Sequence, residues 1–209
     1  HGQQIGGQIL EDDPFGQGFL ERIARAQERS RTSRLTKIQK ALQIAVPQFE
    51  ELQFEKDEFT GRPHLKARFK HFRPNAGWQR EEQFSDGTLR LLGLLWSLLE
   101  SSSLLLMEEP ELSLNSSIVA EIPAMMYRIQ RQSKRRRQIF ITSHSDALLS
   151  NPGIDAGGVL LVEPGENGST IREMNEGEAA AIKDGFSVAE VILPAARPSS
   201  ARQLSFALE

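Results

Sequence analysis

The sequence has no cysteine and few aromatic residues, with 1 Tyr, 2 Trp and 11 Phe among 209 residues. Without cysteine, neither a disulfide framework nor a thiolate metal site can form. The sequence also has no run of about 18 apolar residues, so a transmembrane helix is excluded on length. We therefore expect a cytoplasmic protein with no membrane partner.

The sequence also lacks a strong excess of one charge, since 25 Lys and Arg face 28 Asp and Glu for a net charge of −3. Any attraction to nucleic acid must then come from a local patch. A length of 209 residues allows one good core, or one domain with an appendage. The chain begins His-Gly rather than Met, with no secretory signal pattern. We expect a fragment of a longer gene product.

The first 80 residues predict a tail and then a small α+β region. Residues 1–18 are rich in Gly and Gln and predict a tail or linker. Within the helix and β-hairpin region 19–80, apolar residues at helical spacing predict a helix over 18–45, which Pro47 ends. Two alternating segments around Phe-Thr-Gly-Arg-Pro then predict a β-hairpin that turns at Gly61.

The second strand of that hairpin alternates apolar and cationic side chains. Leu65, Ala67 and Phe69 share one face, while the opposite face carries Lys66, Arg68 and Lys70. We expect those three cations on a solvated outer face.

Residues 81–195 have the pattern of an α/β domain. Aliphatic strands are expected at 104–107, 138–142 and 158–163, and helices at 87–99, 115–132 and after His144. Such strands, separated by helices, predict a mostly parallel sheet flanked by helices on both faces. A hairpin and a small helix close the region, and 196–209 is expected to be a tail that includes a cloning scar.

Polar side chains follow two of these strands. Glu108 and Glu109 come directly after Leu-Leu-Leu-Met, and His144 follows Ile-Phe-Ile-Thr-Ser. Ligands in an open parallel sheet bind beyond the carboxyl ends of the strands. One carboxylate there can hold a hard cation through water while the other orients an attacking water. A helix-entry turn explains the two acids equally well, because acids are favoured near a helix N-terminus.

The segment Ser-Asp-Gly-Thr at 85–88 also allows two interpretations. Ser85 suits a helix N-cap and Asp86 suits the first turn. Alternatively, the Ser85 hydroxyl and the free N–H groups from Gly87 onward form an anion site.

Four motifs in this order, F-S-D-G-T-L-R, L-L-L-M-E-E-P-E, S-L-N and I-F-I-T-S-H-S, resemble the C-terminal lobe of an ABC-type ATPase head. The branch is that of the SMC, recombination-repair and OLD-like (overcoming lysogenization defect) AAA family ATPases. The resemblance covers residues 20–195. Its implied roles are Mg²⁺ binding for Glu108, catalysis for Glu109 and His144, and ATP binding for Ser85, Asp86, Gly87, Thr88 and Asn115.

The resemblance also implies a missing part. No G-x-x-x-x-G-K-[S/T] loop occurs in the sequence, so nothing in it is expected to cradle the β-phosphate. We therefore expect an upstream Walker A lobe, in the same gene product or on another chain, and ATP hydrolysis only when the lobes combine. In such heads the signature of one protomer covers the γ-phosphate on another, which implies a homodimer around ATP.

The sequence does not decide which process the ATPase cycle controls: DNA repair, or the action of an anti-phage or nuclease effector. Two alternatives remain: a non-catalytic interaction module that keeps the fold, and a transporter ATPase subunit, which the S-D-G-T signature disfavours. Glu163 lacks a later Asp-x-Asp, so a nuclease within this chain is rejected. DNA contact is one interpretation of a basic run; the other is a solvated helix end and loop. The run comprises Arg131, Lys134, Arg135, Arg136 and Arg137.

Overall fold

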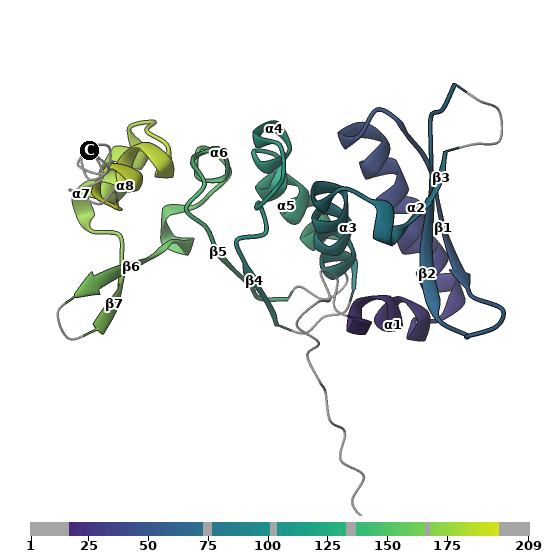
Figure 1. Cartoon of the computed structure of the whole chain (residues 1–209). Coiled ribbons are helices and arrows are strands. Elements are labelled where there is room, and N and C mark those ends of the chain that lie inside the picture. The colour runs from purple at the N-terminus through teal and green to yellow at the C-terminus, as the bar shows by residue number, and fades with distance from the viewer. Residues whose placement is uncertain (1–16, 73–76, 101–103, 133–136, 166–167, 197–209) are drawn as a thin grey trace, which may run out of the picture. The chain divides into compact units, whose positions relative to one another are not determined.

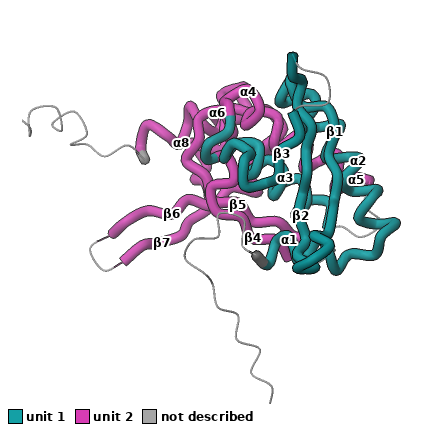
Figure 2. The backbone as a smooth tube through the Cα atoms, turned by 45° about the vertical axis from the view of Figure 1, so that its right-hand side comes forward, with its two compact units in different colours: residues 1–101, 112–114 teal, residues 102–111, 115–209 magenta. Residues whose placement is uncertain are grey.

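The computed structural model describes residues 17–72, 77–100, 104–132, 137–165 and 168–196. The chain forms two compact units, unit 1 with residues 1–101 and 112–114 and unit 2 with residues 102–111 and 115–209 (Figure 2). Apart from residues 17, 18 and 196, the predicted tails lie outside the described residues. Lys134, Arg135 and Arg136 of the basic run lie wholly outside them. No helix in the described ranges is long and apolar enough to cross a membrane.

Unit 1 combines helices with a three-stranded antiparallel sheet in the order β1-β2-β3. Helix α2 packs against β1 and α3 (Figure 1). The elements are α1 (Gln17–Arg25), α2 (Glu28–Ala45), β1 (Phe49–Lys56), β2 (Pro63–Phe69), β3 (Trp78–Arg80), the 3₁₀ turn η1 (Glu81–Gln83) and α3 (Asp86–Leu99).

The single helix predicted over 18–45 is two helices, α1 and α2. The Arg31 guanidinium donates hydrogen bonds to the carbonyls of Ala24 and Ala26, both at 3.2 Å. These carbonyls lie at the end of α1, where a helix leaves acceptors unfilled. The Arg31 side chain therefore stabilises a break that the apolar spacing did not reveal.

The predicted hairpin is confirmed, with Gly61 in the turn at φ 68° and Leu65 and Ala67 buried. Strand β3 was not predicted, and it pairs with β2 from Trp78 to Arg80. It also changes the setting of the hairpin's cations, because the Lys66 amine and the Arg68 guanidinium lie over the Trp78 ring.

Two of the three cations expected on that face, Lys66 and Arg68, are also paired with acids. Lys66 lies 3.8 Å from the Glu55 carboxylate, and Arg68 lies 3.0 Å from that of Glu50. These pairs are partly exposed and contribute little to stability. They offset the charge of Lys66 and Arg68, whereas Lys70 is exposed.

The core of unit 1 combines aliphatic and aromatic side chains. Trp96 is fully buried and meets Phe19 edge-on at 6.5 Å between ring centroids. Phe69 is edge-on to Phe49 and Phe84, at 5.3 and 6.0 Å. Because Phe84 lies just before Ser85, the N-cap of α3, this packing anchors the start of that helix to the sheet.

Unit 2 contains one parallel strand pair and one antiparallel hairpin. In the parallel pair, Leu105 lies opposite Ile139 and Glu108 opposite Thr142. The elements are β4 (Leu105–Glu108), α4 (Ser116–Val119), α5 (Ile122–Gln132), β5 (Ile139–Thr142), α6 (Asp146–Leu149), η2 (Ala156–Gly158), β6 (Leu160–Gly165), β7 (Gly168–Glu173), α7 (Glu176–Lys183) and α8 (Val188–Ala196).

The α/β class is confirmed, but the parallel sheet is smaller than expected. Within the described ranges only β4 and β5 pair in parallel, and β6 pairs with β7 instead. The helix expected over 115–132 is divided into α4 and α5, and Pro123 lies in the first turn of α5. Proline lacks an N–H donor and is well accommodated in the first turn of a helix, so a helix that starts at Ile122 suits Pro123.

Candidate nucleotide site

The carboxyl ends of β4 and β5 bring two of the predicted residues into contact. Oε1 of Glu109 lies 2.7 Å from Nδ1 of His144. The two residues are 35 positions apart in the chain. Glu109 directly follows β4, and His144 lies two residues after the end of β5. The His144 side chain is 75% exposed and that of Glu109 is 32% exposed. A solvent-facing carboxylate held by an imidazole can accept a hydrogen bond from water and orient it.

The Glu109 backbone is held in an unusual conformation. Its φ is 40°, in the left-handed region that residues other than glycine rarely adopt. Its N–H donates to the Thr142 carbonyl at 3.0 Å and to the Thr142 hydroxyl at 3.3 Å. Residues held in such regions cluster at functional sites, where the surrounding structure enforces them. The backbone of Glu109 therefore has the kind of conformation that is found at functional sites.

Glu108 is the last residue of β4 and its side chain is exposed. Across the described residues, its carboxylate has no hydrogen bond or ion pair. Free carboxylate oxygens at a strand end fit the hard-oxygen donor set that Mg²⁺ requires. The position predicted for a metal ligand is therefore open and chemically suited to that ion.

A second link between the two strand ends was not predicted. The Ser143 hydroxyl donates to Oε1 of Glu111 and accepts from the N–H of Ser145 at 3.1 Å. Glu111 is only 7% exposed, and its Oε2 has no partner among the described residues. An acid in E-P-E and a serine before His144 were visible in the sequence, but nothing there indicated that they meet.

The predicted signature residues lie at the start of α3 in unit 1. Oγ of Ser85 accepts from the Thr88 N–H at 3.3 Å and lies 2.9 Å from the Thr88 hydroxyl. Ser85 is therefore the N-cap of α3, and Thr88 is buried. Asp86 is exposed in the first turn. In the described structure the N–H groups of Asp86 and Gly87 have no partner, as is usual for the first turn of a helix.

Packing alone explains why position 87 is a glycine. A Cβ at this position would lie 2.7 Å from the carbonyl oxygen of Ser113, which also belongs to unit 1. Ser113 itself has a φ of 62°. The close approach requires glycine at 87, whether or not a phosphate binds there.

Asn115, predicted to contact nucleotide, caps α4 in this structure. Its Oδ1 accepts from the Ser117 N–H at 2.9 Å and the Ser117 hydroxyl at 2.7 Å. Of the basic run, Arg131 lies over the Tyr127 ring, 5.7 Å from its centroid. The carbonyl of Arg137 accepts from the Gln130 side chain.

The two sets of predicted residues therefore lie in different units. Glu108, Glu109 and His144 belong to unit 2, and the turn that begins at Ser85 belongs to unit 1.

Comparison with solved structures assigns the fold. An SMC ATPase structure from a study of ATP-driven dimerization and DNA-stimulated activation matches with a TM-score of 0.52 and 12% identity. The match covers 75% of this chain and 92% of that one. An SMC head bound to the C-winged helix domain of ScpA matches with a TM-score of 0.53 and 16% identity, over 78% of this chain and 51% of that one.

A third structure, the Smc head of Pyrococcus yayanosii with a coiled coil and joint, matches with a TM-score of 0.53 and 16% identity. The match covers 75% of this chain and 29% of the Pyrococcus yayanosii chain. This chain therefore spans well under two thirds of the length of the second and third structures. These matches show that the chain has the fold of SMC ATPase heads.

The family is shown by sequence. A family model described as "AAA domain, putative AbiEii toxin, Type IV TA system" matches residues 8–150. The chain belongs to this family of AAA-type ATPase domains. No protein with a curated description matches it.

Proposed function

We propose that this chain is the second lobe of an ATP-hydrolysing head and supplies the catalytic carboxylate. The observation that carries the proposal is the 2.7 Å contact between Glu109 and His144 at the ends of a parallel strand pair. Glu109 accepts a hydrogen bond from the attacking water, and His144 holds the Glu109 carboxylate in position. The exposed Glu108 carboxylate would hold Mg²⁺ through water. Bound Mg²⁺-ATP would supply the phosphoryl group that is transferred to water.

The phosphate cradle would come from outside these 209 residues. The sequence contains no G-x-x-x-x-G-K-[S/T] loop, whose backbone and lysine hold the β- and γ-phosphates in P-loop ATPases. We therefore infer that turnover needs a Walker A lobe, joined to this chain or added as a separate one.

The Ser85 turn would act on a different nucleotide from Glu109. The unpaired N–H groups of Asp86 and Gly87 at the start of the 14-residue helix α3 suit an anion. We propose that they face the γ-phosphate bound by a second head, so that ATP joins two heads. The SMC ATPase of the first comparison is itself described by ATP-driven dimerization, which supports this arrangement.

The test measures ATP turnover by this chain alone and by this chain combined with the protein segment encoded upstream of it. We expect turnover only in the combination. Glu109→Gln in the combination should abolish turnover while ATP still drives dimerization, read by analytical ultracentrifugation. Glu121→Gln, an exposed acid in the same unit, is the matched control and should turn over ATP normally.

The possible results separate the alternatives. Full turnover by Glu109→Gln would remove Glu109 from the catalytic role. ATP binding without turnover in the unmodified combination would support the non-catalytic interaction module instead. Turnover by the isolated chain would contradict the proposed need for a second lobe.

The process that the ATPase cycle controls would be DNA repair or an anti-phage or nuclease effector. The family description names a toxin system, and one comparison structure is described by DNA-stimulated activation, which supports both directions. DNA binding through Arg131 and residues 134–137 would weaken steeply with salt and would be lost when these cations are neutralised. Salt-independent binding, or none, would leave the effector protein as the partner.

A further inference from the structure

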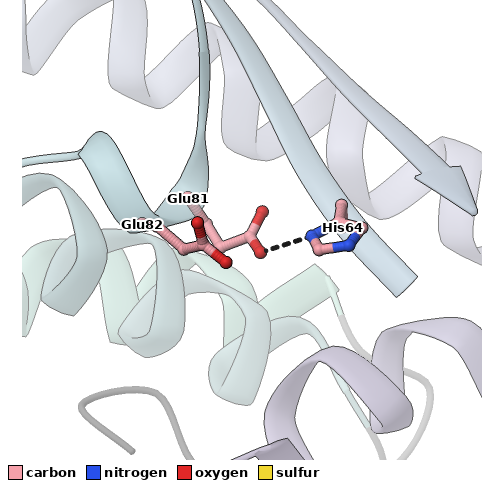
Figure 3. Close-up of side chains that lie close together, drawn as sticks. All are labelled: His64, Glu81 and Glu82. Atoms are coloured by element: carbon pink, nitrogen blue, oxygen red, sulfur yellow. Dashed lines mark hydrogen bonds and ion pairs between the residues drawn. The ribbon is translucent and has the colours of Figure 1, made fainter. Parts of the chain in front are cut away.

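One cluster of side chains in unit 1 has no part in the proposed ATPase site. His64 of β2 lies beside Glu81 and Glu82 of the turn η1 (Figure 3). One nitrogen or oxygen donor from each lies within 4.8 Å of the other two. Within the described ranges, this is the one group of three or more His, Cys, Asp or Glu side chains placed closely enough to share an ion.

Glu81 is held in a fixed orientation at the centre of the cluster. It is 3% exposed, its Oε2 accepts from the Leu65 N–H at 2.8 Å, and its Oε1 lies 2.8 Å from Nδ1 of His64. A backbone N–H on the outer oxygen of a carboxylate is the kind of contact that orients a metal ligand. Oε1 therefore faces His64, and the buried Glu81 side chain needs no rearrangement to present it.

Local geometry also holds Glu81 and Glu82 on one rigid turn. The Gln83 side chain accepts from the Arg80 N–H at 3.1 Å, which ties the two ends of η1 together. Glu82 is exposed, so its carboxylate can rotate toward the other two donors. With metal–ligand bonds of about 2.1 Å, tetrahedral donors lie about 3.4 Å apart. The 2.8 Å contact between His64 and Glu81 lies below that value, and all three donors lie within 4.8 Å of one another, so small shifts would bring them to it.

The charge of the cluster favours a cation. Two carboxylates meet one imidazole, and no described Lys or Arg forms an ion pair with either acid. The nearest arginine in sequence, Arg80, pairs instead with Glu55 at 3.1 Å and with Asp57 at 4.0 Å. A buried carboxylate must be compensated by a partner. His64 is the side-chain partner of Glu81, and Glu82 has no side-chain partner among the described residues.

We propose that His64, Glu81 and Glu82 bind a divalent cation of the zinc class. One nitrogen and two carboxylate oxygens suit Zn²⁺ and its neighbours, whereas Mg²⁺ and Ca²⁺ prefer all-oxygen sites. The ion replaces the hydrogen between Nδ1 of His64 and Oε1 of Glu81, and any proton on that nitrogen passes to solvent. The site ties β2 to the turn that leads through Phe84 into the Ser85 cap of α3.

The test uses the whole chain, freed of metal by a chelator and without nucleotide, so that it does not depend on ATPase activity. Zn²⁺ is titrated and followed by calorimetry and by thermal unfolding. We expect one equivalent to bind, with a rise in Tm of roughly 5 °C or more at 100-fold excess over Kd. Mg²⁺ at the same concentration should leave Tm nearly unchanged.

Variants assign the site. Glu82→Gln and His64→Gln should each weaken Zn²⁺ binding by about tenfold or more, since each removes a ligand. Two controls should keep the affinity: Glu58→Gln, an exposed acid of the same unit, and His144→Gln in unit 2. Because Glu82 is exposed and makes no described bond, Glu82→Gln should fold normally even if His64→Gln does not. Failure of the wild-type chain to bind Zn²⁺, or unchanged binding by Glu82→Gln, would overturn the proposal.

Discussion

We predict that replacing either of two glycines of α3 with alanine changes the stability of the fold in opposite directions. At Gly87 an alanine Cβ would lie 2.7 Å from the Ser113 carbonyl oxygen, whereas at Gly93 it would meet nothing within 4 Å beyond the neighbouring residues and backbone of α3 itself. Ordinary contact between a Cβ and an oxygen needs at least 3.4 Å, so the first substitution forces a shift of about 0.7 Å. The obstacle is a backbone atom of a residue already at φ 62°, which leaves it little freedom to move.

The magnitudes follow from these contacts. Overpacking of this kind costs about 1–3 kcal/mol, so Gly87→Ala should lower Tm by about 2–12 °C. Gly93→Ala removes the backbone entropy of a mid-helix glycine without a clash. It should stabilise by about 0.5–1 kcal/mol and raise Tm by about 1–4 °C.

The assay is thermal unfolding of the whole chain followed by circular dichroism, with urea unfolding as a second measure. Because both substitutions add the same methyl group to the same helix, each serves as the control for the other. Equal shifts of the same sign in both variants would refute the argument that Ser113 packs against the first turn of α3.

Three further predictions concern single contacts. Arg172 lowers the pKa of Glu178 from 4.5 to about 2, so this pair stabilises the fold above pH 4.5 and loses that contribution as pH falls through about 2. Glu178→Gln should therefore flatten the fall of Tm across that range, and an unchanged profile would contradict the pairing. Ser143→Ala leaves the buried Glu111 carboxylate without its donor and should cost about 1–3 kcal/mol in urea unfolding, whereas a cost below 0.5 kcal/mol would dismiss the link. Asn115→Ala should cost about 1 kcal/mol through loss of the α4 cap, and Asn115→Asp should retain it; equal losses would exclude capping as the cause.

Local sequence was sufficient for most elements with a strong pattern. The hairpin around Gly61, the α3 helix capped by Ser85 and strands β4 and β5 all lie close to their predicted ranges. These elements depend on alternation, capping and aliphatic runs, which act over a few residues. The three-residue strand β3 and the break between α1 and α2 were missed, because a pairing partner and an arginine side chain define them.

The same division holds for the sites. The order of the motifs by itself indicated an ABC-type head, and placing Glu109 and His144 after neighbouring strands predicted that they would lie at one edge of a sheet. Only the tertiary structure decided which atoms meet: Glu109 with His144, Glu111 with Ser143, and His64 with Glu81. Those partners are 17 to 35 residues apart in the chain, and no periodicity within a single element encodes such contacts. They exist because strand pairing and turn geometry bring the residues together, which is a property of the folded chain.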